Sequence, residues 1–327
     1  MNGQLITIDG TSHEVTADNV KRMLDSSVPF WLDLEGPDQG GTDLLRRTFG
    51  FHPLAVEDVE HFGQRPKIDT YDDFVLLVVY GATAESGLIE VHCFYSQAFL
   101  VTVHRAPCPG MAALAERLGR ANGAPPDLIM LLYRTLDTLV DTYFPVLASF
   151  DDEIDELEDQ ILERPTEEQL GRLFDMKRSL IALRKVVTPE RDMFASLLGA
   201  RNVLVGMTPD AERYFRDLYD HLIRVSDLVD SYRDLMSGAM DTHLSTVSNR
   251  LNVVMKQLTI IATVFLPLSF LTGFFGQNFG WLVGHIDGLP AFIIYGIGGL
   301  ALPLTLLFVW LRHRASHASI GATLHNN

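Results

Sequence analysis

The stretch Asn252–Asn278, NVVMKQLTIIATVFLPLSFLTGFFGQN, decides the fold, because its only charge lies on Lys256 near its start. No Asp, Glu, Lys or Arg occurs from Gln257 to Ile286, and none occurs from Gly288 to Leu311. A transmembrane helix needs about 20 predominantly apolar residues. The two uncharged runs therefore predict two transmembrane helices, at residues 257–278 and 290–311. An external loop at residues 279–289 joins them. Two buried helices of a soluble protein are the alternative, but such helices rarely sustain uncharged runs of this length.

Basic residues flank the two runs on one side only. Arg250 and Lys256 precede the first, Arg312 and Arg314 follow the second, and the loop between them has no Lys or Arg. Positively charged flanks stay in the cytoplasm. The sequence therefore predicts a multi-pass protein of the cell inner (plasma) membrane with both termini cytoplasmic and a cytosolic tail at 312–327.

The composition argues against several classes of function. A net charge of −16 disfavours nucleic acid as a partner. The chain has no Gly-Lys pair and hence no phosphate-binding P-loop, and no G-x-S-x-G or H-E-x-x-H motif. Its eleven histidines are scattered. The sequence therefore predicts neither an enzyme nor an organic cofactor.

The part before the membrane divides into an α+β region and a helical region. Short apolar runs of strand type occur at Leu5–Ile8, Phe30–Leu34, Phe74–Tyr80, Val91–Tyr95 and Phe99–His104. Helical patterns lie between them, for example after Pro53. We expect a cytosolic α/β domain at 1–126 and a cytosolic helical region at 127–208, with breaks near Pro165, Gly199–Gly206 and Pro209.

No proline occurs between Pro209 and Pro267, and apolar residues recur there at spacings of three and four. This seam consists of Leu218, Leu222, Val225, Val229, Tyr232, Met236 and Ala239. One helix from about Asp210 to Phe275 would be about 100 Å long, of which a bilayer needs about a third. The remainder predicts a stalk at 209–256, whose seam we expect to contribute contacts between subunits.

Polar and small residues follow one face of this helix into the membrane. In a 3.5-residue register they are Asp241, Ser245, Ser248, Asn252, Met255, Thr259, Ala262, Leu266, Ser269 and Gly273. In a symmetric bundle they would form rings of hydroxyl and amide oxygens, which suit hard cations such as Mg²⁺, closed in places by Met255 and Leu266. Small-residue packing in a membrane dimer is the alternative. It explains Ala262 and Gly273 but leaves Asn252 unexplained.

Three blocks of the sequence resemble the CorA magnesium transporter family. They are the stretch Asn252–Asn278, the cytosolic block HPLAVEDVEHFGQRPKIDTYDDF at His52–Phe74, and LDTLVDTYFPVLASFDDEIDELED at Leu136–Asp159. The family's signature is Gly-Met-Asn after an aromatic residue at the end of the first span. Here Phe275 is followed by Gly276, Gln277 and Asn278. The resemblance covers nearly the whole chain in order.

The resemblance implies a funnel-shaped homopentamer in the lipid bilayer, with an α+β cytosolic domain, a long helical stalk and a pore lined by the first span. It places ion entry and selectivity at Gly276, Gln277 and Asn278. The family's pore-facing positions fall on Asn252, Met255, Leu258, Leu266, Ser269 and Asn278. Leu258 conflicts with the register above, which prefers Thr259, and both stay open.

The resemblance further implies a channel for divalent metal cations, foremost Mg²⁺ but also Co²⁺ and Ni²⁺, driven by the membrane potential. Mg²⁺ would be both the transported ion and the regulator that closes the channel from the cytosol. In the family, an acidic residue at the position of Asp241 helps to bind regulatory Mg²⁺ between subunits. Glu85 and Asp73 are candidate partners on the neighbouring subunit.

Two departures from the family pattern bear on the ion. Gln277 stands where the family usually has Met, and the loop after Asn278 lacks the glutamate often found there. The zinc-linked ZntB branch also varies the middle signature residue, so a zinc transporter, with or without proton coupling, is the alternative. An alternative from another class is a membrane-anchored sensor without transport, which requires neither Asn278 nor a polar stripe.

Overall fold

The computed structural model describes residues 2–83, 87–119, 127–199, 203–277, 280–285, 288–299, 301–302, 305–306 and 309. The chain divides into two compact units, Met1–His243 and Leu244–Asn327. The first contains the sheet and most of the helices, and the second contains the apolar segments.

In the described part of the first unit, seven strands form one sheet in the order β2-β1-β3-β7-β6-β5-β4. Their bounds are β1 (Asn2–Thr7), β2 (Ser12–His13), β3 (Phe30–Glu35), β4 (Lys67–Thr70), β5 (Val75–Thr83), β6 (Gly87–Tyr95) and β7 (Phe99–His104). Neighbours are antiparallel except β3 and β7, which are parallel. The five predicted strands are confirmed. The strands β2 and β4 were not predicted, because they are short and contain little apolar sequence.

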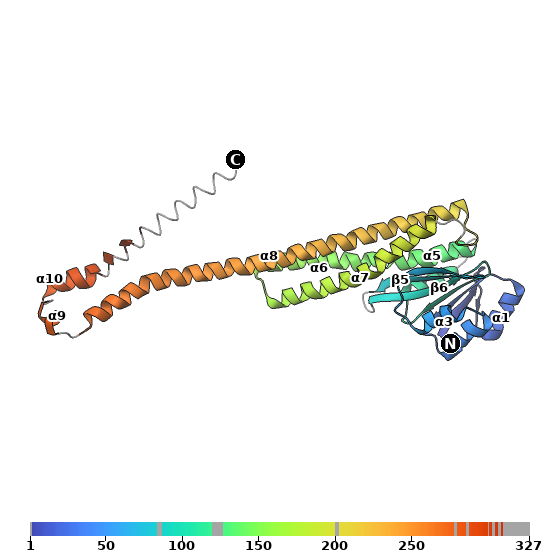
Figure 1. Cartoon of the computed structure of the whole chain (residues 1–327), viewed down its shortest axis with the longest axis horizontal. Helices are drawn as coiled ribbons and strands as arrows, with labels where there is room; N and C mark the ends of the chain where they lie inside the picture. Colours follow the sequence, from blue (N-terminus) through green and yellow to red (C-terminus); the bar gives the residue numbers. More distant parts are fainter. Residues whose placement is uncertain are drawn as a thin grey trace. The chain divides into compact units, whose positions relative to one another are not determined.

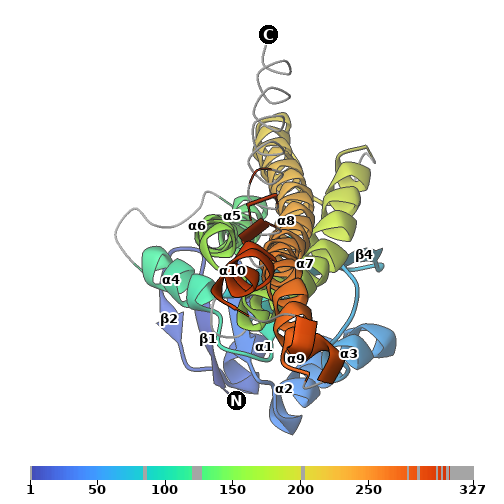
Figure 2. The same ribbon diagram turned by 90° about the vertical axis from the view of Figure 1, so that its left-hand side faces the viewer.

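Helices cover the sheet on both faces, and this explains why β5 and β7 are buried along almost their whole length. Figure 1 shows α5 and α7 on one side of the sheet and α1 and α3 on the other. Figure 2 shows α4 beside the β1–β2 edge, where the Leu118 carbonyl closely approaches Gly10. The bounds are α1 (Ala17–Ser26), α2 (Gln39–Asp43), the π-helical turn η1 (Leu44–Thr48), α3 (Pro53–Glu60), α4 (Pro109–Leu118), α5 (Leu128–Asp141), α6 (Tyr143–Glu163) and α7 (Glu167–Gly199).

The predicted helix breaks and the long helix are confirmed. α6 ends at Glu163, just before Pro165, and α7 ends at Gly199. α8 (Pro209–Phe275) then runs for 67 residues without interruption, including Pro267. It contains an apolar window long enough to cross a membrane, and none of that window is buried within the chain.

The expectation that the apolar seam of α8 contributes contacts between subunits is wrong. Every seam residue is buried within the single chain, from Leu218 and Leu222 to Met236 and Ala239. α8 runs antiparallel to α7, as the contacts Arg191–Ser226, Arg184–Asp230 and His243–Thr166 show. A spacing of three and four is equally typical of a helix packed within its own subunit, and here this intramolecular packing covers the seam.

The second unit is described in part beyond α8. It contains α9 (Gly280–His285), α10 (Leu289–Ala291) and the π-helical segment η2 (Phe292–Gly298). Apolar helix over Leu289–Gly298 is shorter than a full span, so a second transmembrane helix at 290–311 stays a prediction. Asn278, Asp287 and Glu85 lie outside the described residues.

Candidate functional site

One face of α8 in the second unit is partly covered, and the opposite face is open. The half-buried positions are Thr246, Ile260, Val264, Leu268 and Leu271. At about 100° per residue they share one side of the helix. The polar stripe lies on the other side of the helix. All of its residues in this unit are exposed: Ser245, Ser248, Asn252, Met255, Thr259, Ala262, Leu266, Ser269 and Gly273.

Leu258 and Thr259 are both exposed and both belong to the open half of α8. The Thr259 hydroxyl donates a hydrogen bond of 2.7 Å to the Met255 carbonyl one turn earlier. The hydroxyl proton thus points to the helix backbone. The hydroxyl oxygen retains lone pairs that can bind a cation or accept a hydrogen bond. Of the two residues, only Thr259 offers an oxygen ligand. The choice between them as the pore-facing residue stays open.

The signature begins where α8 ends. Gly276 donates its N–H to the Thr272 carbonyl (2.9 Å) and Gln277 donates to Phe274 (3.3 Å). A Cβ on Gly276 would lie 2.9 Å from the Thr272 oxygen, a close approach that favours glycine at this turn. The backbone of Gly276 and Gln277 therefore closes the helix immediately before Asn278.

Asp241 lies on the exposed surface of α8 in the first unit. Asp73, one of its candidate partners on a neighbouring subunit, is also exposed. The single chain thus leaves both carboxylates open to solvent, and their predicted pairing across subunits stays a prediction.

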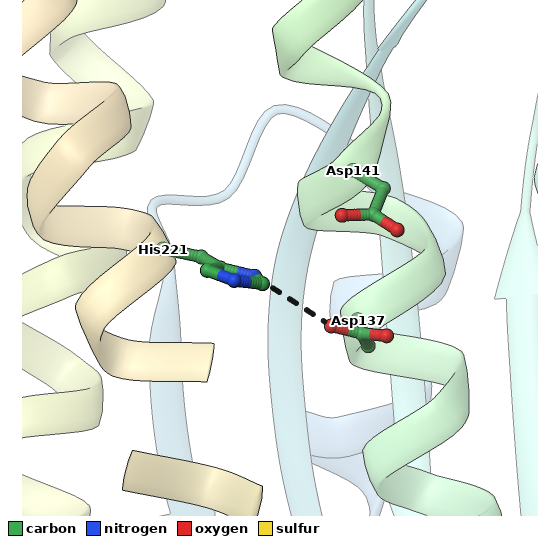
Figure 3. A group of neighbouring side chains, drawn as sticks. All are labelled: Asp137, Asp141 and His221. Atoms are coloured by element: carbon green, nitrogen blue, oxygen red, sulfur yellow. Dashed lines mark ion pairs between the residues drawn. The ribbon is translucent and has the colours of Figure 1, made fainter. Parts of the chain in front are cut away.

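A group of side chains of the kinds that ligate metals lies between α5 and α8. Asp137, Asp141 and His221 each offer a ligand atom, and these atoms lie within 4.8 Å of one another (Figure 3). His221 Nδ1 is 3.8 Å from Asp137 Oδ1, and Nε2 is 4.0 Å from Asp217 Oδ2. Carboxylate oxygens suit Mg²⁺, whereas imidazole suits Zn²⁺, Co²⁺ and Ni²⁺. The cluster can therefore hold a divalent cation between the two helices.

The electrostatics of this cluster favour a cation. Burial raises the pKa of Asp137, and repulsion from the Asp141 and Asp217 carboxylates raises it further, while His221 acts in the opposite direction. Like charges held close together raise the free energy of the ionised state, and a divalent ion removes that repulsion. This cluster was not predicted from the sequence. Its only local signal is the spacing of four in Asp137–Asp141 and Asp217–His221, which places each pair on one helix face.

Comparisons with known proteins agree with this architecture. Residues 26–313 match the model of a family described as CorA-like Mg²⁺ transporter protein. The cobalt/magnesium transport protein CorA of Thermotoga maritima is 38% identical over 274 residues, covering 79% of this chain and 75% of its own length. The zinc transport protein ZntB of Enterobacter sp. (strain 638) is 27% identical and covers 90% of this chain and 89% of its own length.

Among solved structures, the complete CorA magnesium transporter from Methanocaldococcus jannaschii has the same fold. Its TM-score is 0.68 at 23% identity, and the alignment covers 86% of each chain. The α+β domain, the long helix and the apolar C-terminal segments thus define a divalent metal ion transporter of the CorA/ZntB kind. The chain belongs to the CorA-like Mg²⁺ transporter family.

Proposed function

We propose that this protein is a homopentameric channel that carries Mg²⁺, and also Co²⁺ and Ni²⁺, inward across the cell inner membrane. The single observation that carries the proposal is the open polar face of α8, which lies opposite its half-buried face. In a pentamer the open face lines the pore, and the half-buried face turns toward the second span and the lipid. Both termini then lie in the cytoplasm.

Conduction in this scheme uses weak oxygen ligands. Mg²⁺ loses its water reluctantly, so a ring of Asn278 amides would bind the hydrated ion through its first-shell waters. Asn252, Thr259 and Ser269 supply further oxygens along the pore, and Met255 and Leu266 form apolar constrictions. The membrane potential drives entry, since a divalent charge gains about 4.6 kcal/mol per 100 mV, twice the value for one charge.

Regulation in this scheme depends on cations bound outside the membrane. Two carboxylates and an imidazole lie together in the Asp137–Asp141–His221 cluster, and Asp241, exposed on the stripe, would meet carboxylates of neighbouring subunits in the pentamer. A divalent ion at the cluster ties α5 to α8, the helix that continues into the pore. Loss of the ion at low cytosolic Mg²⁺ releases that tie and shifts the population toward the open state.

Zinc transport is the second candidate, because three observations favour it. Gln277 replaces the usual signature Met, and a ZntB relative aligns over 90% of this chain. His221 in the cytosolic cluster adds an imidazole ligand of the kind that Zn²⁺ prefers.

Ion uptake into proteoliposomes decides between the two. Purified protein is reconstituted, and entry of Mg²⁺, Co²⁺, Ni²⁺ and Zn²⁺ is compared under an inside-negative potential, with and without a pH gradient. A magnesium channel takes up Mg²⁺ in proportion to the potential and independently of the pH gradient. Zn²⁺ uptake that requires the gradient, without Mg²⁺ uptake, would identify the zinc transporter. Absence of flux for all four ions would contradict both.

A further inference from the structure

A basic groove of about 720 Å³ opens in the first unit between the 63–66 loop, α7 and α8. Four cationic side chains line this groove: Arg65, Arg184, Lys185 and Arg233. No Asp or Glu is among the described lining residues. The chain as a whole has a net charge of −16. A concentration of positive charge from three separate segments is therefore a specific feature of this groove.

Two of the four cationic side chains pair with carboxylates of the chain, and the other two do not. Arg184 pairs with Asp230 at 2.9 Å, and Arg233 lies 3.5 Å from Asp230 and 3.4 Å from Asp234. Within the described residues, no carboxylate lies within 4.0 Å of the charged nitrogens of Arg65 or Lys185. The groove therefore retains two uncompensated positive charges beside two that are paired at its rim.

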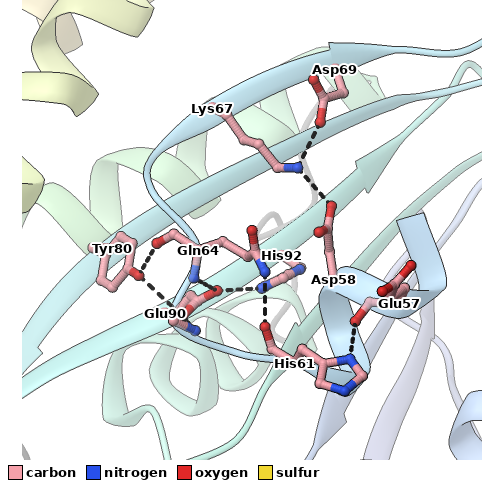
Figure 4. A network of polar contacts seen from close by, with 10 residues as sticks. Glu57, Asp58, His61, Gln64, Lys67, Asp69, Tyr80, Glu90 and His92 are labelled. Atoms are coloured by element: carbon pink, nitrogen blue, oxygen red, sulfur yellow. Dashed lines mark hydrogen bonds and ion pairs between the residues drawn. The ribbon is translucent and has the colours of Figure 1, made fainter. Parts of the chain in front are cut away.

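Hydrogen bonds to the buried Glu90 fix the loop that carries Arg65. Glu90, which is 8% exposed, accepts hydrogen bonds from the backbone N–H groups of Gly63 (2.5 Å) and Gln64 (3.2 Å), as Figure 4 shows for the surrounding network. Tyr80 contacts both Glu90 Oε2 (3.0 Å) and the Gln64 carbonyl. Gly63 has φ +105°, a conformation that favours glycine. The backbone beside Arg65 is thus fixed before any ligand arrives.

Burial acts to raise the pKa of Glu90, but hydrogen bonds from His92 and from Gly63 and Gln64 outweigh it, so the pKa is lowered. His92 Nε2 lies 2.7 Å from Glu90 Oε1. The carboxylate therefore stays ionised while it accepts these bonds. The negative charge of Glu90 is neutralised in part by its hydrogen bonds to the loop and to His92. Glu90 is not among the residues that line the groove.

We propose that this groove binds a small polyanion of the polyphosphate class, a function distinct from ion transport. Its volume is in the range of small-molecule pockets, which is more than a monovalent anion requires. Guanidinium groups match phosphate oxygens in pairs, and a lysine ammonium adds a point charge. The Thr188 side chain in the wall supplies a neutral donor. Cations from three segments then contact successive phosphates of one ligand.

Calorimetry of the full chain in detergent tests this proposal, with inorganic pyrophosphate as the probe and EDTA present. Chelation removes divalent ions, so neither the pore nor the Asp137–Asp141–His221 cluster takes part. We compare wild type with Arg65→Ser/Lys185→Ser and with a matched control, Arg22→Ser/Lys177→Ser. Both doubles remove two positive charges, but the control residues lie outside the groove.

The expected result is binding by wild type and by the control, and a loss of at least about tenfold (about 1.4 kcal/mol) in the groove double. The charge-conserving double Arg65→Lys/Lys185→Arg should retain binding. Tighter binding of ATP than of pyrophosphate would identify an organic polyphosphate, and the reverse an inorganic one. No binding by wild type at about 5 mM pyrophosphate, or equal losses in the groove and control doubles, would overturn the proposal.

Discussion

The backbone N–H of Tyr80 on β5 donates a 3.1 Å hydrogen bond to Oε1 of Glu190 on α7, which lies 110 residues further along the chain. The Tyr143 hydroxyl lies 3.0 Å from the other carboxyl oxygen. Glu190 is 1% exposed, and burial raises its pKa to about 8 against the effect of these two hydrogen bonds. The carboxyl that joins α7 to the sheet is therefore protonated at neutral pH.

This pKa predicts a pH-dependent stability. Between pH 4.5 and about 8 the unfolded chain releases the Glu190 proton while the folded chain retains it. The contribution of Glu190 to the free energy of unfolding is therefore full below pH 4.5 and decreases up to about pH 8, by up to a few kcal/mol. Glu190→Gln should lack this dependence. Guanidinium denaturation followed by fluorescence of the buried Trp31 measures it, and identical pH slopes in variant and wild type would refute it.

Asn278→Ala should abolish metal uptake in proteoliposomes while leaving expression and oligomer size intact. The proposed amide ring is the point where the hydrated ion is first bound, and alanine supplies no oxygen there. Asn2→Ala, which changes the same residue type on β1 in the first unit, serves as the control. Near-normal flux through a correctly assembled Asn278→Ala protein would remove Asn278 from selectivity.

The detergent-solubilised protein should have the mass of a pentamer. A pore needs several helices around a hydrated ion, and two copies of α8 cannot enclose one. Mass measurement by light scattering, corrected for bound detergent, checks this. A stable dimer would contradict the pore model directly.

Leu222→Ala should destabilise the subunit by about 2–5 kcal/mol, because Leu222 is fully buried within the chain. The oligomeric state should not change, since the residue has no surface with which to contact another subunit. Leu235→Ala, at an exposed position on the same helix, is the matched control and should have little effect on stability. Dissociation of the oligomer by Leu222→Ala would restore the seam as a subunit contact.

Millimolar Mg²⁺ should protect the cytosolic part of wild type from proteolysis, and chelation should remove that protection. Asp137→Asn should need more Mg²⁺ for the same protection, because it removes one charged ligand of the cluster. Asp241→Ala, at the exposed stripe position, should also be less protected if it binds regulatory Mg²⁺. A variant with the wild-type Mg²⁺ dependence excludes its residue as a regulatory ligand.

Local patterns were sufficient for most of the architecture. Apolar runs such as Phe99–His104 predicted strands to within a few residues, because a strand buried on both faces is largely apolar. Pro165 predicted the end of α6 and the glycines at Gly199–Gly206 predicted the end of α7, because both residue types disfavour a continuing helix. Proline alone is not decisive, since Pro189 and Pro267 lie inside α7 and α8. The strand β4 was missed because Lys67–Thr70 at the sheet edge needs little apolar sequence.

The sequence by itself determined the apolar helix, its polar stripe and the family, because each depends on residue types at fixed spacings along one segment. Only the tertiary structure decided what covers each face. It buried the Leu222 seam inside the subunit, although its spacing alone is equally typical of an interface between subunits. It also brought Asp137 on α5 to His221 on α8 and surrounded the basic groove with three segments. Such contacts depend on how distant segments pack together, and no local periodicity records that packing.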